Sequence, residues 1–235
     1  MNLPSKLQSL TPPNTLQSSS SATPSPPASP PPSPTLHPYA PSARQYLLSS
    51  NSTGASSVAN VEDVAFEHKG WSGWTTERLI EGARGAGGIV DLLRRAELRH
   101  KSRQNAEEVD VNRPHCPLVV LLTGTNDLAH STSSSSITTS LSTLHNLVYS
   151  TSPSSSTVAL TIPPSKYTSL TPSANLIRTE VNAWINHFCE TESRCVAVVP
   201  LAETLEMMAP DGLHFSVEGY REMGVRVGRV IEGGL

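Results

Sequence analysis

Three short, continuous apolar runs constrain the fold of this chain more than any other feature of its sequence. They are separated by amphipathic stretches longer than ten residues, and they cover residues 116–124, 157–165 and 195–203. A continuous apolar run of this length is typical of a strand that is covered on both faces. Strands that alternate with helices form parallel β-α-β units, so the pattern predicts an α/β fold with a layered sheet.

Helical periodicity predicts the elements around these strands. Apolar residues recur at helical spacing in five stretches, which are residues 39–50, 75–104, 137–149, 175–189 and 216–233. Glycines interrupt the second stretch, so we expect two helices there. Thr75 or Thr76 is expected to cap the first of these two helices, and Ser216 the closing helix. Residues 61–70 contain β-branched and aromatic side chains and are predicted to form another strand.

The amino-terminal segment differs in composition from the rest of the chain. Residues 1–38 hold eleven of the twenty prolines and many serines, with almost no apolar run. Such a segment cannot bury enough apolar surface to offset the entropy lost on ordering. We therefore expect a disordered Pro/Ser-rich segment over residues 1–36 and a single domain over residues 37–235.

The charge distribution and the lack of long apolar stretches exclude several functions. The net charge is −3, and acidic residues interleave with or follow the basic ones around residues 94–103. We therefore expect no nucleic-acid partner. No apolar stretch approaches the roughly 20 residues that span a bilayer, so we expect no membrane span. No secretory signal is recognised at the amino terminus, which favours a cytoplasmic location.

The three cysteines give no sign of a metal site. Cys189 and Cys195 are close enough in sequence to form a disulfide in an oxidising compartment, which would leave Cys116 over. Without a secretion signal we expect three reduced thiols instead. Neither a Cys-x-x-Cys nor a His-x-x-x-His pairing occurs, so no metal and no cofactor is expected.

Chemically suggestive residues follow the predicted strands, where an α/β sheet places its functional site. Asp211 and His214 stand three residues apart, just before the closing helix. A carboxylate that accepts from one ring nitrogen of histidine holds the imidazole so that it can act as a general base. The simpler alternative is an aspartate that caps a turn beside a surface histidine.

Two further residues are candidate donors to a developing oxyanion. Asn126 follows a predicted buried strand, and Gly73 lets its backbone N–H come close to a ligand. The alternatives are that Asn126 caps the next helix and that Gly73 belongs to an ordinary turn. Asp127 is expected to orient its loop rather than react. His130 is not expected to be the base, because only Asp127 precedes it at a useful spacing.

The order of these motifs resembles the SGNH hydrolases, also called the GDSL esterase/lipase family. The segments "GWSGWTT", "GTND" and "DGLH" are similar to the second, third and fifth blocks of that family, and the likeness covers residues 37–232. It implies a flavodoxin-like three-layer α/β/α sandwich with a mainly parallel sheet. It also implies hydrolysis of small carboxylic esters through an acyl-enzyme, with His214 and Asp211 catalytic and Gly73 and Asn126 in the oxyanion hole.

One family block is missing from the sequence. The family's nucleophile is the serine of a Gly-Asp-Ser block after the first strand, and no such block stands before His37. The nucleophile is therefore unknown. Ser72 half matches a Gly-x-Ser-x-Gly elbow, but Trp74 replaces the last glycine. Three other serines lie at the distance before the segment "HPYAP" (residues 37–41) that the family's nucleophile would have. They stand among prolines without a strand to hold them: Ser25, Ser29 and Ser33.

The missing block leads to two alternatives. Because the family's first strand lies between two others, its absence would leave a gap with unpaired backbone groups. We therefore expect the sequence to be incomplete, with its true start replaced by Pro/Ser-rich text. A catalytically inactive SGNH-like binding protein is the alternative. A nucleotide-binding or phosphate-binding module is disfavoured, because no glycine-rich loop follows a strand.

Overall fold

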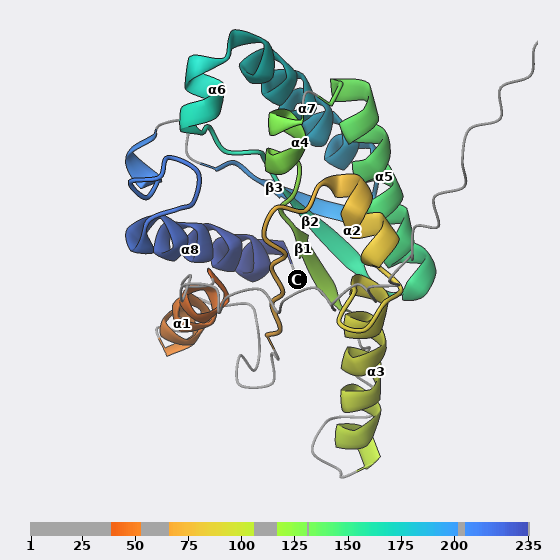
Figure 1. Ribbon diagram of the computed structural model, residues 1–235. Helices are drawn as coiled ribbons and strands as arrows, with labels where there is room; N and C mark the ends of the chain where they lie inside the picture. The colour runs from red at the N-terminus through yellow and green to blue at the C-terminus, as the bar shows by residue number, and fades with distance from the viewer. Residues whose placement is uncertain (1–38, 53–65, 106–116, 131, 202–204, 235) are drawn as a thin grey trace, which may run out of the picture. The chain divides into compact units, whose positions relative to one another are not determined.

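The computed structural model describes residues 39–52, 66–105, 117–130, 132–201 and 205–234 (Figure 1). These residues belong to one unit that spans residues 36–235. In chain order its elements are α1 (Tyr39–Ser52), α2 (Thr76–Gly82), α3 (Ile89–Asn105), β1 (Leu118–Leu121), α4 (Thr125–Ala129), α5 (Ser134–Thr151), β2 (Ser156–Leu160), α6 (Lys166–Leu170), α7 (Pro172–Thr191), β3 (Cys195–Val199), the 3-10 helix η2 (Leu205–Met207) and α8 (Val217–Gly234). The predicted disordered segment 1–36 lies outside the described residues.

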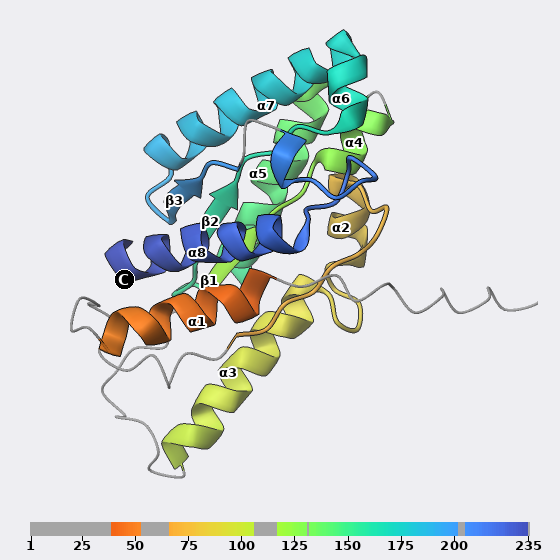
Figure 2. The ribbon, with the colours of Figure 1, turned by 90° about the vertical axis from the view of Figure 1, so that its left-hand side faces the viewer.

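Parts of the three apolar runs form a parallel sheet, as predicted, and the order of its strands is β1-β2-β3. Leu118 of β1 pairs with Ser156 of β2, and Thr157 of β2 pairs with Cys195 of β3. Helices α1 and α8 lie on one side of this sheet, and α5 and α7 lie on the other (Figures 1 and 2). The unit is therefore a three-layer α/β/α sandwich, which confirms the fold class expected from the sequence.

Side chains of β2 alternate between two apolar cores. Val158 and Leu160 pack with residues of α1 and α8, such as Leu47 and Met223. Ala159 belongs to the opposite core, together with apolar residues of α5 and α7. Each of these β2 residues is almost completely buried. The burial of both faces explains why the sequence of this strand is continuously apolar.

Strand β1 is less buried than the sequence predicts. All four of its residues are only half-buried, although Val119 packs toward α3 and α5 and Val120 toward the opposite core. Among the described residues β1 pairs with β2 alone, so its other edge has no strand beside it. The predicted strand 61–70 does not fill this edge in the described part, because residues 66–70 form no strand. Residues 61–65 lie outside the described ranges.

A disulfide corrects the expectation of three reduced thiols. Cys189 lies in the last turn of α7 and Cys195 begins β3, and their sulfur atoms are bonded. The helix-to-strand connection brings the two Cα atoms within 4.8 Å of each other, a separation that suits a disulfide. The expectation of reduced thiols gave too little weight to this short connection. Cys116 lies outside the described residues.

The long helices are amphipathic. Helix α7 has 20 residues, and α5 and α8 have 18 each. Each directs a stripe of apolar side chains to the sheet and exposes polar ones on its other side. In the ranges that the structure describes, no helix combines the length and the apolar character that a membrane crossing requires.

A buried polar cluster lies between α5 and β2. His145 Nδ1 lies 2.8 Å from Thr157 Oγ1, and the hydroxyl of Tyr149 lies 2.7 Å from the same oxygen. The His145 ring also packs against Phe188, with 4.7 Å between the ring centroids. Burial lowers the pKa of His145 to about 4. The imidazole is therefore neutral in the folded chain at neutral pH.

Acidification is expected to destabilise the fold through His145. Its pKa is about 4 in the folded chain and 6.5 in its unperturbed state, so the unfolded chain takes up the proton first as the pH falls. The free energy of unfolding should decrease by about 3 kcal/mol between about pH 6.5 and pH 4. Urea unfolding across this range measures the change. His145→Gln, which cannot titrate, should lose this part of the pH dependence, and an unaltered dependence would contradict the assignment.

Candidate active site

Asp211 and His214 form a bonded pair in the loop between η2 and α8. Asp211 Oδ2 lies 2.7 Å from His214 Nδ1. Asp211 Oδ1 accepts hydrogen bonds from the backbone N–H groups of Leu213 and His214, at 2.9 and 3.0 Å. The Asp211 and His214 side chains keep 51% and 39% of their surface exposed, so a substrate can reach them. The structure therefore brings the predicted acid and imidazole together.

The electrostatics of the pair suit a base and its orienting partner. The hydrogen bond from the His214 side chain, followed by those from the two backbone N–H groups, lowers the pKa of Asp211 to about 2. Asp211 is thus a carboxylate at neutral pH and can only accept hydrogen bonds. His214 Nδ1 must carry the shared hydrogen, which leaves Nε2 as the nitrogen that can take a proton from a nucleophile.

Backbone hydrogen bonds hold this loop in shape. The N–H of Ala209 donates to the His214 carbonyl at 2.7 Å, and Met208 forms an isolated antiparallel bridge with Phe215. Gly212 has φ +66°, in the region that favours glycine. The N–H of Lys166, the first residue of α6, donates to the Gly212 carbonyl at 2.7 Å. The loop is thereby fixed to the segment that follows β2.

Gly73 occupies an exposed turn before α2. Its φ is +73°, and a Cβ added there would meet nothing within 4 Å. The turn is closed by a hydrogen bond from the N–H of Trp74 to the Trp71 carbonyl. Thr75 then caps α2 by accepting from the Arg78 N–H, as the sequence predicts. A ligand can therefore approach the backbone of Gly73 closely.

Asn126 and Asp127 bind the chain around α2 from the neighbouring loop. Asn126 Nδ2 donates to the Trp74 carbonyl at 2.8 Å. Asp127 is only 2% exposed, and its carboxyl oxygens accept from the Thr76 N–H at 3.0 and 3.2 Å and from the Thr76 hydroxyl at 2.7 Å. Asp127 thus orients its loop, in agreement with the sequence-based expectation.

The predicted site residues therefore fall into two groups, one around Asp127 and one around His214. In the described part of the chain, no hydrogen bond or ion pair joins the Asp211–His214 pair to Gly73 or Asn126. One N–H of the Asn126 amide is used by Trp74, and its second N–H remains for a ligand. No serine hydroxyl in the described ranges bonds to His214, and Ser72 is exposed in the turn beside Gly73. The serines at 25, 29 and 33 lie outside those ranges.

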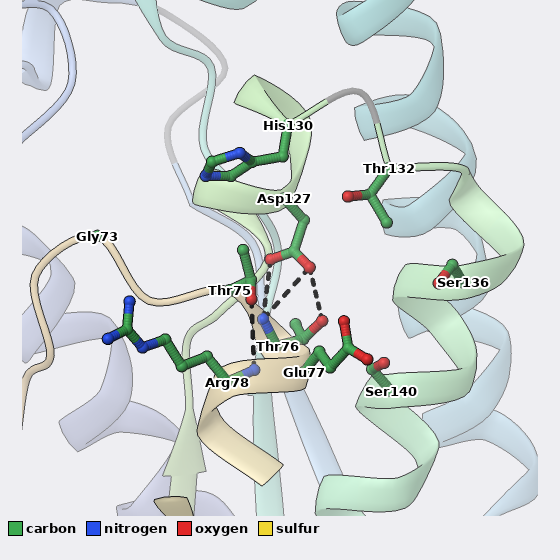
Figure 3. A pocket seen from close by; sticks show the side chains of 10 residues that line it. All are labelled: Gly73, Thr75, Thr76, Glu77, Arg78, Asp127, His130, Thr132, Ser136 and Ser140. Atoms are coloured by element: carbon green, nitrogen blue, oxygen red, sulfur yellow. Dashed lines mark hydrogen bonds between the residues drawn. The ribbon is translucent and has the colours of Figure 1, made fainter. Parts of the chain in front are cut away.

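A cavity of about 340 Å³ lies beside the first group (Figure 3). Its lining comes from the Gly73 turn, the start of α2, the α4 loop and the start of α5. The residues that line it are Gly73, Thr75, Thr76, Glu77, Arg78, Asp127, His130, Thr132, Ser136 and Ser140. Asn126, Asp211 and His214 do not line this cavity. Of the proposed oxyanion donors, Gly73 alone borders it.

Sequence reasoning missed the contacts that assemble the two groups. The bonds between Asp127 and Thr76 join residues 51 positions apart, and Lys166 and Gly212 come from separate predicted elements. Helices α4 and α6 have only five residues each, too few for a periodic pattern. Gly124 was a local signal for the left-handed backbone just before α4, because its φ of +106° lies in the region that favours glycine.

A family model supports the assignment that the geometry suggests. The model of the GDSL-like lipase/acylhydrolase family matches residues 31–222, which is more than half of the chain. The chain belongs to the GDSL-like lipase/acylhydrolase family. It is thus an SGNH-type hydrolase of ester bonds by family, as the order of its motifs predicted. No curated protein sequence matches the chain.

Solved structures of two GDSL-like lipases and of an esterase share the fold of the chain. A GDSL-like lipase from Bacteroides thetaiotaomicron is 16% identical, with 84% of this chain and 83% of that chain covered and a TM-score of 0.54. A GDSL-like lipase from Parabacteroides merdae is 16% identical, with 82% and 80% covered and a TM-score of 0.56. An acetyl esterase mutant crystallised with an acetate ion is 18% identical, with 83% and 89% covered and a TM-score of 0.53.

The Asp127–Thr76 contact is expected to stabilise the fold as a unit. Asp127→Asn should lower the free energy of unfolding by about 1–3 kcal/mol, because an amide nitrogen would face the buried Thr76 N–H. Urea unfolding measures the loss. Thr76→Val, which keeps the shape and removes the hydroxyl, completes a double-mutant cycle. The two changes should show coupling in this cycle, and strictly additive losses would argue against a direct interaction.

Proposed function

We propose that this chain hydrolyses small carboxylic esters with His214 as the general base and Asp211 as its orienting partner. The observation that carries the proposal is the 2.7 Å contact between Asp211 Oδ2 and His214 Nδ1. It leaves Nε2 to remove a proton from the nucleophile and to return it to the leaving alcohol. The family membership of the chain supports ester bonds as the target.

The proposed oxyanion donors are the backbone N–H of Gly73 and the side-chain amide of Asn126. The turn at Gly73 is open to a ligand, and the Asn126 amide is held in place by its bond to the Trp74 carbonyl. Fixed donors of this kind stabilise the negative charge of a tetrahedral intermediate. Trp74 directly follows Gly73, so the hydrogen bond from Asn126 to the Trp74 carbonyl holds Asn126 near the Gly73 turn.

The proposed nucleophile is a serine that a fluorophosphonate probe can identify. Such a probe forms a covalent bond with an activated serine hydroxyl, and peptide mapping of the labelled chain locates the residue. Labelling at one serine that disappears in His214→Ala supports the proposed mechanism. Labelling that persists in His214→Ala would contradict the role of His214 as the base.

A second candidate function is a catalytically inactive ester-binding protein. It is favoured by the absence, within the described ranges, of a serine hydroxyl bonded to His214. A folded chain that binds esters but is neither labelled nor active would support this function. The proposed partner in both cases is a small-molecule ester, which the family membership supports. Nucleic acid is not a proposed partner, because acidic residues accompany the basic cluster around residues 94–103.

The cytoplasmic location expected from the sequence stays a prediction, and the Cys189–Cys195 disulfide argues against it. Disulfides persist in oxidising compartments and are rare in the cytosol. Alkylation of the chain in its native cells, before and after reduction, decides the question. We expect Cys189 and Cys195 to react only after reduction, and reaction beforehand would support the cytoplasmic location.

Substitution of His214 tests the proposed base. His214→Ala should lower kcat for p-nitrophenyl acetate by about 10²–10⁴-fold, the usual contribution of a general base. His187→Ala is a matched control, because His187 is also exposed and also stands three residues from an acid, Glu190, at 3.9 Å. The control should retain the rate of the unmodified chain. Equal rates in the two variants would contradict the proposed role.

A further inference from the structure

The described residues that line the cavity beside Gly73 include no apolar side chain. One of the lining residues is Asp127, which is fixed by three hydrogen bonds from Thr76. Glu77 and Arg78 come from α2, and the hydroxyls of Ser136 and Ser140 come from α5 (Figure 3). A cavity of this composition does not suit a hydrocarbon chain, because an apolar ligand would take water from polar groups without replacing its hydrogen bonds.

Most of these polar side chains have hydrogen-bonding capacity to spare. Within the described part of the chain, six of them make no side-chain hydrogen bond, namely Glu77, Arg78, His130, Thr132, Ser136 and Ser140. They include donors, acceptors and hydroxyls that can be either. Two carboxyl groups and one guanidinium line the same space, so no single sign of charge selects an ion. A neutral ligand with several hydroxyl groups matches this set.

Gly73 connects the cavity to the proposed chemistry. It borders the cavity and is also the proposed backbone donor to the ester oxygen. A substrate whose carbonyl oxygen meets Gly73 can therefore extend one of its halves into the cavity. The cavity volume of about 340 Å³ lies within the range of small-molecule sites, roughly 300–1,000 Å³.

We propose that this cavity holds the alcohol half of the substrate and that this half is a neutral, hydroxyl-rich group such as a sugar ring. The inference rests on the proposed function for its link to the ester bond. Glu77, Ser136 and Ser140 act as specificity residues, because their side chains line the cavity without taking part in the proposed proton transfer.

Two esters with the same acyl group test the specificity. Methyl 6-O-acetyl-β-glucoside carries a hydroxyl-rich alcohol, whereas ethyl acetate does not. Ser136→Leu places an apolar side chain at the cavity wall and should lower the ratio of the two kcat/KM values by about tenfold, in disfavour of the glucoside. Ser150→Leu makes the same change at an exposed position near the other end of α5 and should keep the original ratio.

A second variant guards against misfolding of the first. Glu77→Gln keeps the size of the side chain and replaces a carboxylate that can accept from two hydroxyls. It should shift the kcat/KM ratio in the same direction as Ser136→Leu. Ratios that stay unchanged in both variants, or an equal loss on both esters, would overturn the inference.

A binding measurement separates this inference from the proposed function. Methyl β-glucoside, which has no ester bond, should show saturation-transfer signals with the unmodified chain and with His214→Ala, and weaker ones with Ser136→Leu. If no ester is hydrolysed but this pattern holds, the proposed function and the assignment of an alcohol half fail, whereas the binding of a hydroxyl-rich group in the cavity stands. If esters are hydrolysed but the glucoside shows no binding to the unmodified chain, the cavity assignment is wrong.

Discussion

The burial of β2 on both faces is the constraint on which the rest of the structure depends. Val158 and Leu160 secure the layer of α1 and α8, while Ala159 secures that of α5 and α7. The segment that leaves β2 then positions both groups of site residues. Ile162 lies so close to Gly124 that a Cβ there would be 2.5 Å from Ile162 Cδ1, and the Lys166 N–H binds the Gly212 carbonyl. The loop that follows β1 and the Asp211–His214 loop are thus both held by the segment that follows the central strand β2.

The two groups of candidate site residues differ in burial and in what their carboxyl groups bind. Around Asp127, a buried carboxyl group satisfies the backbone and hydroxyl of Thr76, so that removal of either partner would leave a buried polar group unpaired. Around Asp211, an exposed carboxylate orients an exposed imidazole. This division suits the proposed catalytic site, because the proposed base can meet a substrate while the turn that holds the proposed oxyanion donors stays fixed.

Much of the fold was predictable because its signals are local. The β2 segment is continuously apolar because both of its faces are buried, and α7 and α8 carry helical periodicity because only one side of each helix meets the sheet. Predictions were less accurate where neighbours decide the outcome. The residues of β1 are half-buried because strand pairing occurs on one edge in the described ranges, and residues 66–70 form no strand despite their composition.

The sequence by itself determined the parallel α/β architecture and the order of the family motifs, and it offered the pairing of Asp211 with His214 as one of two alternatives. These features need only periodicity and residues within one turn of each other. The tertiary structure alone decided that Asp127 binds Thr76, that Lys166 holds Gly212 and that Gly73 borders a polar cavity. These contacts join segments far apart in the chain, and no local pattern encodes them, because they exist only once the helices have packed on both faces of β2.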